Sequence, residues 1–219
     1  MGVVTDAWAW LTTGAHWSGD GGIGQRLAEH VYVSGVALLL ACALALPLGL
    51  WLGHLGRGGT LAVNLSNAGR AVPVFAVLAL FMVSPLRTAG SVPTVIALVL
   101  FALPPLLTNA YVGMREVDRA VVEAARGMGM SGGQLFRKVE LPLARPLVMT
   151  GVRSAAVQVV ATATIAAMVG QGGLGRIITA GFNTYNTPQV VAGALLVALL
   201  ALLVEAALVG ADRLLGRRA

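Results

Sequence analysis

Long runs of apolar residues without a single charge constrain the fold of this chain more than any other feature. The runs 31–53 and 91–114 contain no Asp, Glu, Lys or Arg. Each is long enough to cross a bilayer as one helix, which takes about 20 apolar residues. Only 11% of the 219 residues are charged, against about 25% in an average soluble domain. Such a chain lacks the polar surface that a globular core needs in water, and we expect an all-α integral membrane protein.

The same criterion predicts about five transmembrane helices, over residues 31–53, 61–83, 91–114, 142–169 and 188–210. A β-barrel is disfavoured because these segments are continuously apolar and do not alternate. The second segment is the least apolar. Its polar residues either line a path through the membrane or form bonds between helices, and Arg70 either faces such a path or lies at the cytoplasmic edge. On the first interpretation, the path residues are Asn64, Asn67, Arg70 and Pro73.

Positive charge is concentrated on one predicted side of the membrane. Six of the 15 Lys and Arg residues lie in the loop 115–146, and three more arginines lie in the C-terminal tail. Cytoplasmic loops carry an excess of Lys and Arg, so we expect this loop and the C-terminus in the cytoplasm and the N-terminus outside. The chain then divides into an N-terminal extracytoplasmic segment 1–29, a transmembrane domain 30–210 and a basic cytoplasmic tail 211–219.

The N-terminal segment has two open interpretations. Trp8, Trp10 and Trp17 are typical of a segment that rests at a membrane interface. A loosely ordered tail is the alternative.

The cytoplasmic loop contains a polar stretch, 123–142, that predicts two short helices around a glycine hinge. In the first helix, apolar side chains share one face at helical spacing: Val121, Val122 and Ala125. Gly127 and Gly129 are expected to end this helix, because glycine adopts backbone angles that other residues avoid.

The second short helix is predicted to begin at Ser131, which forms a capping-box pattern with Gln134. Its apolar face consists of Leu135, Phe136 and Val139, and the pair Leu141–Pro142 leads into the next apolar segment. A short amphipathic helix suits a groove on a partner protein. An interfacial helix on lipid headgroups is the alternative, although Glu123 and Glu140 disfavour contact with anionic lipid.

This stretch resembles the cytoplasmic loop of permease subunits of bacterial ABC importers, in which binding proteins deliver the substrate to a type I transmembrane domain. The family pattern is EAA, three residues, Gly, nine residues, Ile, any residue, Leu-Pro. The chain has Glu123-Ala124-Ala125, Gly129, Val139 and Leu141-Pro142 at this spacing, with Val in place of Ile. The resemblance implies that the loop couples to a separate ATP-binding subunit through Glu123, Ala124, Ala125, Gly127, Gly129, Leu135, Phe136, Val139, Leu141 and Pro142.

A second resemblance lies in the glycine-rich segment Val169-Gly170-Gln171-Gly172-Gly173-Leu174-Gly175. It is similar to the GxGGLG segment of osmoprotectant permeases and, more distantly, of methionine permeases. The segments 70–73 and 120–130 are similar to the glycine betaine, carnitine and choline branch. We expect a tight outer turn at Gly170, Gly172, Gly173 and Gly175 rather than a nucleotide-phosphate loop, because no strand precedes these glycines and no soluble βαβ unit follows.

The resemblance implies a permease subunit of an ATP-driven importer of osmoprotectants in the bacterial cytoplasmic (inner) membrane. The implied partners are an ABC ATP-binding subunit, a second permease in a homodimer or heterodimer, an extracytoplasmic substrate-binding protein and the lipid bilayer, with no nucleic acid. We expect no catalytic residues, no metal site and no cofactor, with ATP bound by the partner subunit. A methionine or other amino-acid permease, an integral-membrane enzyme and an ATP-independent channel are the alternatives.

Overall fold

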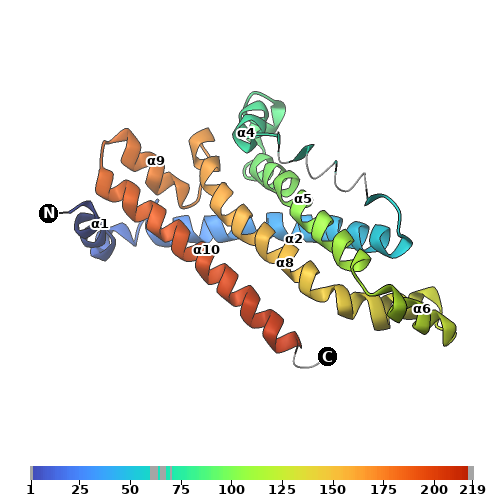
Figure 1. Cartoon of the computed structure of the whole chain (residues 1–219). Helices are drawn as coiled ribbons and strands as arrows, with labels where there is room; N and C mark the ends of the chain where they lie inside the picture. The colour runs from blue at the N-terminus through green and yellow to red at the C-terminus, as the bar shows by residue number, and fades with distance from the viewer. Residues whose placement is uncertain (1, 60–63, 65–67, 70, 217–219) are drawn as a thin grey trace. The chain divides into compact units, whose positions relative to one another are not determined.

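The computed structural model describes residues 2–59, 64, 68–69 and 71–216, and the regular elements in these ranges are helices. Four of the described helices are long, namely α2 (Ile23–Leu55), α5 (Val92–Arg115), α8 (Leu141–Ala163) and α10 (Thr187–Gly216) (Figure 1). Each belongs to a helical stretch that is long and apolar enough to cross a membrane. The all-helical membrane class that the sequence predicts is therefore confirmed.

Four of the predicted spans coincide with these described helices. The spans 31–53 and 188–210 lie within α2 and α10, and 91–114 corresponds to α5. The span 142–169 covers α8 together with the 3₁₀ helix η4 (Thr164–Val169) that continues it.

The remaining predicted span, 61–83, is described only in part. Its described helix, α4 (Val74–Met82), has nine residues, about half the length that crosses a bilayer. Pro73 was expected inside the span but is the N-cap of α4, a position that suits a residue without a backbone N–H. Asn64 is exposed, whereas Asn67 and Arg70 lie outside the described residues. The count of five spans stays a prediction.

Shorter helices complete the described part of the chain. They are α1 (Val3–Thr12), η1 (Gly14–His16), η2 (Pro85–Thr88), α6 (Arg119–Gly127), α7 (Gly132–Leu135), the π-helical turn η3 (Phe136–Glu140) and α9 (Gly175–Asn183).

The chain forms two compact units, each assembled from three separate stretches. Unit 1 comprises Met1–Leu38, Pro73–Val99 and Ala156–Ala206, and unit 2 comprises Leu39–Val72, Leu100–Ala155 and Ala207–Ala219. Each of the four long helices contributes one segment to each unit. Neither unit is therefore a continuous piece of sequence.

Glycines let the helices of unit 1 pack closely. Ile23, Leu174, Ile177 and Val197 form a buried apolar cluster of this unit. Helix α9 lies alongside the first turns of α10 (Figure 1), where a Cβ atom on Gly193 would be only 2.7 Å from the Ile178 side chain. Small residues at helix contacts are typical of membrane bundles, where close packing holds the helices together.

Unit 2 follows the same rule. Its core contains Met114, Val122, Leu135 and Ala144, with further apolar residues packed around them. A Cβ atom on Gly49 in α2 would lie 2.8 Å from the Ala110 side chain in α5. Glycine at this position therefore sets how closely α2 approaches α5 within this unit.

The long helices also carry large apolar side chains on their exposed faces. Leu39 in α2 and Leu202 in α10 expose 72% and 67% of their surface. In water such faces would be unfavourable, but lipid solvates them.

Candidate functional site

Helix α6 begins the predicted coupling loop and packs against the core of unit 2. The Asp118 side chain caps its first turn by accepting a hydrogen bond from the Ala120 N–H at 2.9 Å. Val122 and Ala125 are buried, as the helical spacing predicts, but Val121 is 42% exposed. The prediction for Val121 is wrong, because adjacent residues in a helix point about 100° apart.

The turn after α6 closes with a Schellman motif, in which backbone N–H groups satisfy the last carbonyl groups of the helix. The Gly129 N–H donates to the Arg126 carbonyl at 2.9 Å, and the Met130 N–H donates to the Ala125 carbonyl at 3.2 Å. Gly129 has a φ of +83°, which a residue with a Cβ adopts only with strain. Gly127 is the last residue of α6, so the helix ends at the two glycines as expected.

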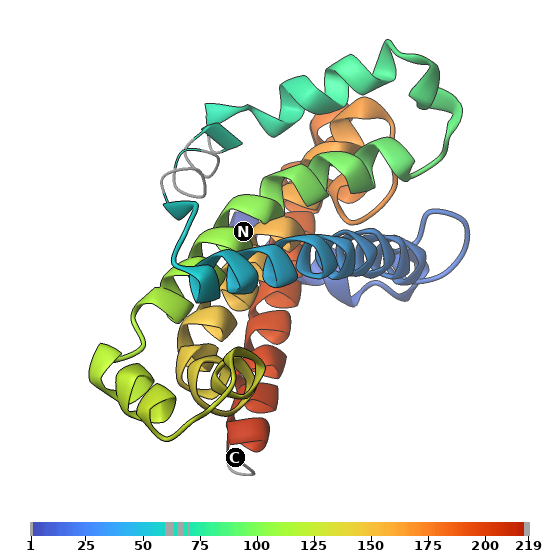
Figure 2. The same ribbon diagram turned by 90° about the vertical axis from the view of Figure 1, so that its right-hand side faces the viewer.

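The capping box predicted for the second short helix is confirmed. The Ser131 N–H donates to Gln134 Oε1 at 2.9 Å, and the Gln134 N–H donates to Ser131 Oγ at 3.4 Å. Helices α6 and α7 thereby fold into a helical hairpin (Figure 2).

The apolar side chains of this hairpin face the core of unit 2. Leu135 is almost fully buried there, and Phe136 and Val139 pack against the same cluster. We expected this apolar face to contact a partner protein. In the structure its side chains mainly hold the hairpin against unit 2. Exposed residues on its other side include Glu123, Ala124 and Met128, with Met128 74% exposed.

A hydrogen-bonded pair with a buried carboxyl group, which the sequence pattern did not predict, fixes the end of the hairpin. Glu140 is 2% exposed, and its carboxylate accepts a hydrogen bond from the His54 Nδ1–H at the end of α2. The ring of Phe136 meets the His54 ring edge-on, with centroids 5.5 Å apart. The one sign of this contact in the sequence is that Glu140 stands between the apolar residues Val139 and Leu141.

The last part of the EAA-type pattern opens helix α8. Leu141 is its first residue and partly buried, and Pro142 is exposed. The π-helical turn η3 continues directly into α8, and Pro142 has no N–H to donate to the turn before it. Further along, Arg145 donates to the Asp212 carboxylate at 2.9 Å and ties α8 to the end of α10 within unit 2.

The glycine-rich segment forms a tight turn in unit 1, as the sequence predicts. Gly170 and Gly173 have φ angles of +84° and +90°. A Cβ atom on Gly175 would overlap the Thr164 carbonyl oxygen, and one on Gly172 would overlap the Glu29 carboxylate. Two of these glycines are therefore needed for backbone angles and two for close approach.

Two side chains at the start of α2 hold this glycine turn (170–175). Glu29 accepts hydrogen bonds from the Gly173 N–H and from Arg26 Nη1, both at 2.8 Å. His30 is 1% exposed, and its Nδ1 accepts from the Leu174 N–H at 3.2 Å. The His30 Nε2–H therefore donates to the Val160 carbonyl at 2.9 Å. Sequence reasoning missed both residues, since 144 positions separate each from its partner in the turn.

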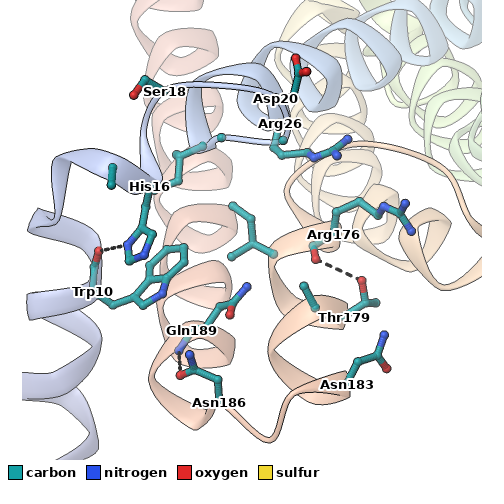
Figure 3. Close-up of a pocket in the computed structure, with 16 residues that line it drawn as sticks. Trp10, His16, Ser18, Asp20, Arg26, Arg176, Thr179, Asn183, Asn186 and Gln189 are labelled. Carbon is teal, nitrogen blue, oxygen red and sulfur yellow. Dashed lines mark hydrogen bonds between the residues drawn. The ribbon is translucent and has the colours of Figure 1, made fainter.

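A polar cavity of about 650 Å³ lies elsewhere in unit 1, between the N-terminal segment, the start of α2 and α9 (Figure 3). The Trp10 ring stacks on His16 at 4.1 Å on one side, and Arg176 and Asn183 come from α9 on the other. Residues of the N-terminal segment between Trp10 and Arg26 thus form one wall of a cavity.

Long apolar helices, an EAA-type hairpin and a glycine turn define a polytopic membrane protein of the transporter class. The chain belongs to the family of binding-protein-dependent transport system inner membrane components, whose family model matches residues 45–219. It is a multi-pass protein of the cytoplasmic membrane.

Proteins similar in sequence carry consistent names. A glycine betaine/carnitine/choline transport system permease protein of Bacillus subtilis (strain 168) is 35% identical, over 86% of this chain and 86% of its own length. A carnitine transport permease protein of Listeria monocytogenes is 38% identical, over 82% of each chain. An osmoprotectant import permease protein of Salmonella typhimurium is 34% identical, over 84% of this chain and 76% of its own length.

The fold is similar to that of a chain of the MetNI methionine ABC transporter, solved in an inward-facing conformation. The TM-score is 0.75 at 23% sequence identity, and the match covers 87% of this chain and 94% of the other. The architecture is therefore that of an ABC transporter permease.

Proposed function

We propose that this chain is the permease subunit of an ATP-driven importer of osmoprotectants such as glycine betaine, carnitine and choline. The observation that carries the proposal is the similarity to permeases with these names across more than four-fifths of the chain. The likeness to a methionine transporter is weaker evidence for a substrate, because at 23% identity it concerns the fold.

The proposed mechanism divides the work among several subunits. Two permeases form the path, and a binding protein outside the cell delivers the substrate. Two ATP-binding subunits in the cytoplasm contact the α6–α7 hairpins, bind and hydrolyse ATP, and so bias the permeases between inward- and outward-open states. The exposed side of the hairpin, which includes Met128, and the buried tie between Glu140 and α2 support this proposal. The chain itself then needs no cofactor and performs no hydrolysis.

The proposal also fixes a topology. The chain crosses the membrane five times, with the N-terminus outside and the hairpin and C-terminus in the cytoplasm. The excess of Lys and Arg in the loop 115–146 supports this orientation.

Uptake by the assembled transporter in proteoliposomes tests the proposed function. With ATP inside and the matching binding protein outside, labelled glycine betaine, carnitine or choline should accumulate, whereas methionine should not. Accumulation of methionine alone would replace the proposed substrate class. Entry of a quaternary amine without ATP would instead favour a channel. The same holds if no ATP-binding subunit co-purifies with the chain.

A further inference from the structure

A second, smaller cavity in unit 1 lies beside the glycine turn. Its volume is about 280 Å³. The first turns of α2, the start of α5 and the turn itself form part of its walls. The polar or aromatic residues that line it are Arg26, Glu29, His30, Tyr32, Ser91, Thr94 and Gln171.

The Thr94 hydroxyl in this cavity is buried without a partner. Thr94 is 2% exposed, and its Oγ1 makes no hydrogen bond to any residue that the structure describes. Buried polar groups are almost always hydrogen-bonded, because leaving one unpaired is costly. A hydroxyl that gives nothing to the fold but lines a cavity is placed to bond a ligand.

The same cavity presents both signs of charge. Arg26 and Glu29 form an ion pair at 2.8 Å, and both line the cavity. Their side chains are 21% and 30% exposed, so a ligand can still reach them. A ligand with a carboxylate and an ammonium group offers an opposite charge to each member of the pair, whereas a simple cation offers one only to Glu29.

The cavity also suits an ammonium group that carries methyl groups. Such a group has no N–H to donate, so it is held by a carboxylate and by the face of an aromatic ring. Glu29 supplies the carboxylate, and Tyr32 supplies an aromatic ring to the lining. A volume of about 280 Å³ has room for a small molecule of this kind.

We propose that this cavity is a substrate site within the permease, which binds a small zwitterion with a carboxylate and a methylated ammonium group through Arg26, Glu29, Tyr32 and Thr94. The inference rests on the proposed transport function and adds the site and the preferred substrate class. It places substrate contact at the glycine turn, and not at the polar residues of the segment 61–83.

Direct binding to the permease–ATPase complex, reconstituted in nanodiscs without the binding protein, tests the site. The wild-type complex should bind labelled glycine betaine saturably and choline more weakly. Thr94→Val should raise the dissociation constant for glycine betaine about tenfold, the effect of one lost hydrogen bond that leaves its partner unpaired. Its unfolding temperature should stay the same or rise, because the buried hydroxyl has no partner in the fold.

Ser34 offers a matched control. Its hydroxyl is also buried without a partner among the described residues, but Ser34 is not part of the cavity lining. Ser34→Ala should therefore leave the dissociation constant unchanged.

Four results would overturn the site, its specificity or the transport function on which it rests. Unchanged binding by Thr94→Val would remove the proposed role of the hydroxyl, and choline binding as tight as that of glycine betaine would remove the preference for a zwitterion. A wild-type complex that binds nothing, although the complete importer accumulates glycine betaine, would overturn the site and leave the transport function standing. An importer that accumulates no quaternary amine would overturn both.

Discussion

At the scale of single residues, Glu140 is a buried polar position at the end of the α6–α7 hairpin. It ends the π-helical turn η3, where the Leu141 N–H bonds to the Phe136 carbonyl five residues back. A π turn inserts one residue relative to an α-helix, so the side chains after it rotate by about 100°. Glu140 is directed inward and meets His54 at the end of α2. The hairpin is therefore linked to α2 by a hydrogen-bonded pair as well as by apolar contacts.

The two members of this pair should respond unequally to mutation. His54→Ala leaves the buried Glu140 carboxyl without its donor and should lower the free energy of unfolding by about 3 kcal/mol, as when a buried pair loses one partner. Glu140→Gln keeps an acceptor for His54 and should cost only about 1 kcal/mol. Reversible denaturation by SDS in mixed micelles measures both. A loss well below about 1 kcal/mol for His54→Ala would show that His54 does not stabilise the buried carboxyl.

Gly129 and the Ser131 capping box could be predicted because their signals are local. A positive φ and a reciprocal cap are each set by residues within a few positions. His54 and Glu140 are 86 residues apart, and no local pattern brings them together. The same holds for Glu29 and His30, whose partners in the glycine turn depend on how α2 packs within unit 1.

At the scale of elements, the α6–α7 hairpin has one face that anchors it in unit 2 and another side that is exposed. Val122 and Leu135 anchor it in the core of unit 2. Met128, between the end of α6 and the Schellman glycine, carries an unbranched apolar side chain into solvent. Flexible methionine side chains adapt to partner surfaces. In the sequence, the one sign of this exposed position is a methionine between two glycines.

Met128→Asp should separate docking from folding. Because the side chain is 74% exposed, the stability of the permease should change by less than about 0.5 kcal/mol. Co-purification with the ATP-binding subunit and ATP-driven uptake should fall about tenfold, since a charge would face an apolar contact at the interface. Met128→Leu keeps the apolar contact and serves as the control. Full uptake by the Asp variant would exclude Met128 from the interface.

At the scale of the whole molecule, composition and apolar run length were sufficient to predict the membrane class. Charge-free runs predicted the helices α2 and α5, and a run with a single charge, Glu205, predicted α10, because crossing a bilayer requires long apolar runs. The division into two units could not be predicted, since each unit combines three distant stretches of chain. The segment 61–83 was ambiguous from the start, because its polar residues reduce its apolar character.

Two exposed positions, one before and one after 61–83 in the sequence, can test whether this segment crosses the membrane. The protein has one cysteine, Cys42, so Cys42→Ala provides a background for Ser18→Cys and Glu116→Cys. Five spans put three crossings between these positions, and they should lie on opposite sides. A membrane-impermeant maleimide should then label Ser18→Cys in intact cells and Glu116→Cys only after lysis. If 61–83 does not cross, only two crossings separate them, and both cysteines should react under the same condition. A reversed pattern would instead contradict the orientation that the Lys and Arg distribution predicts.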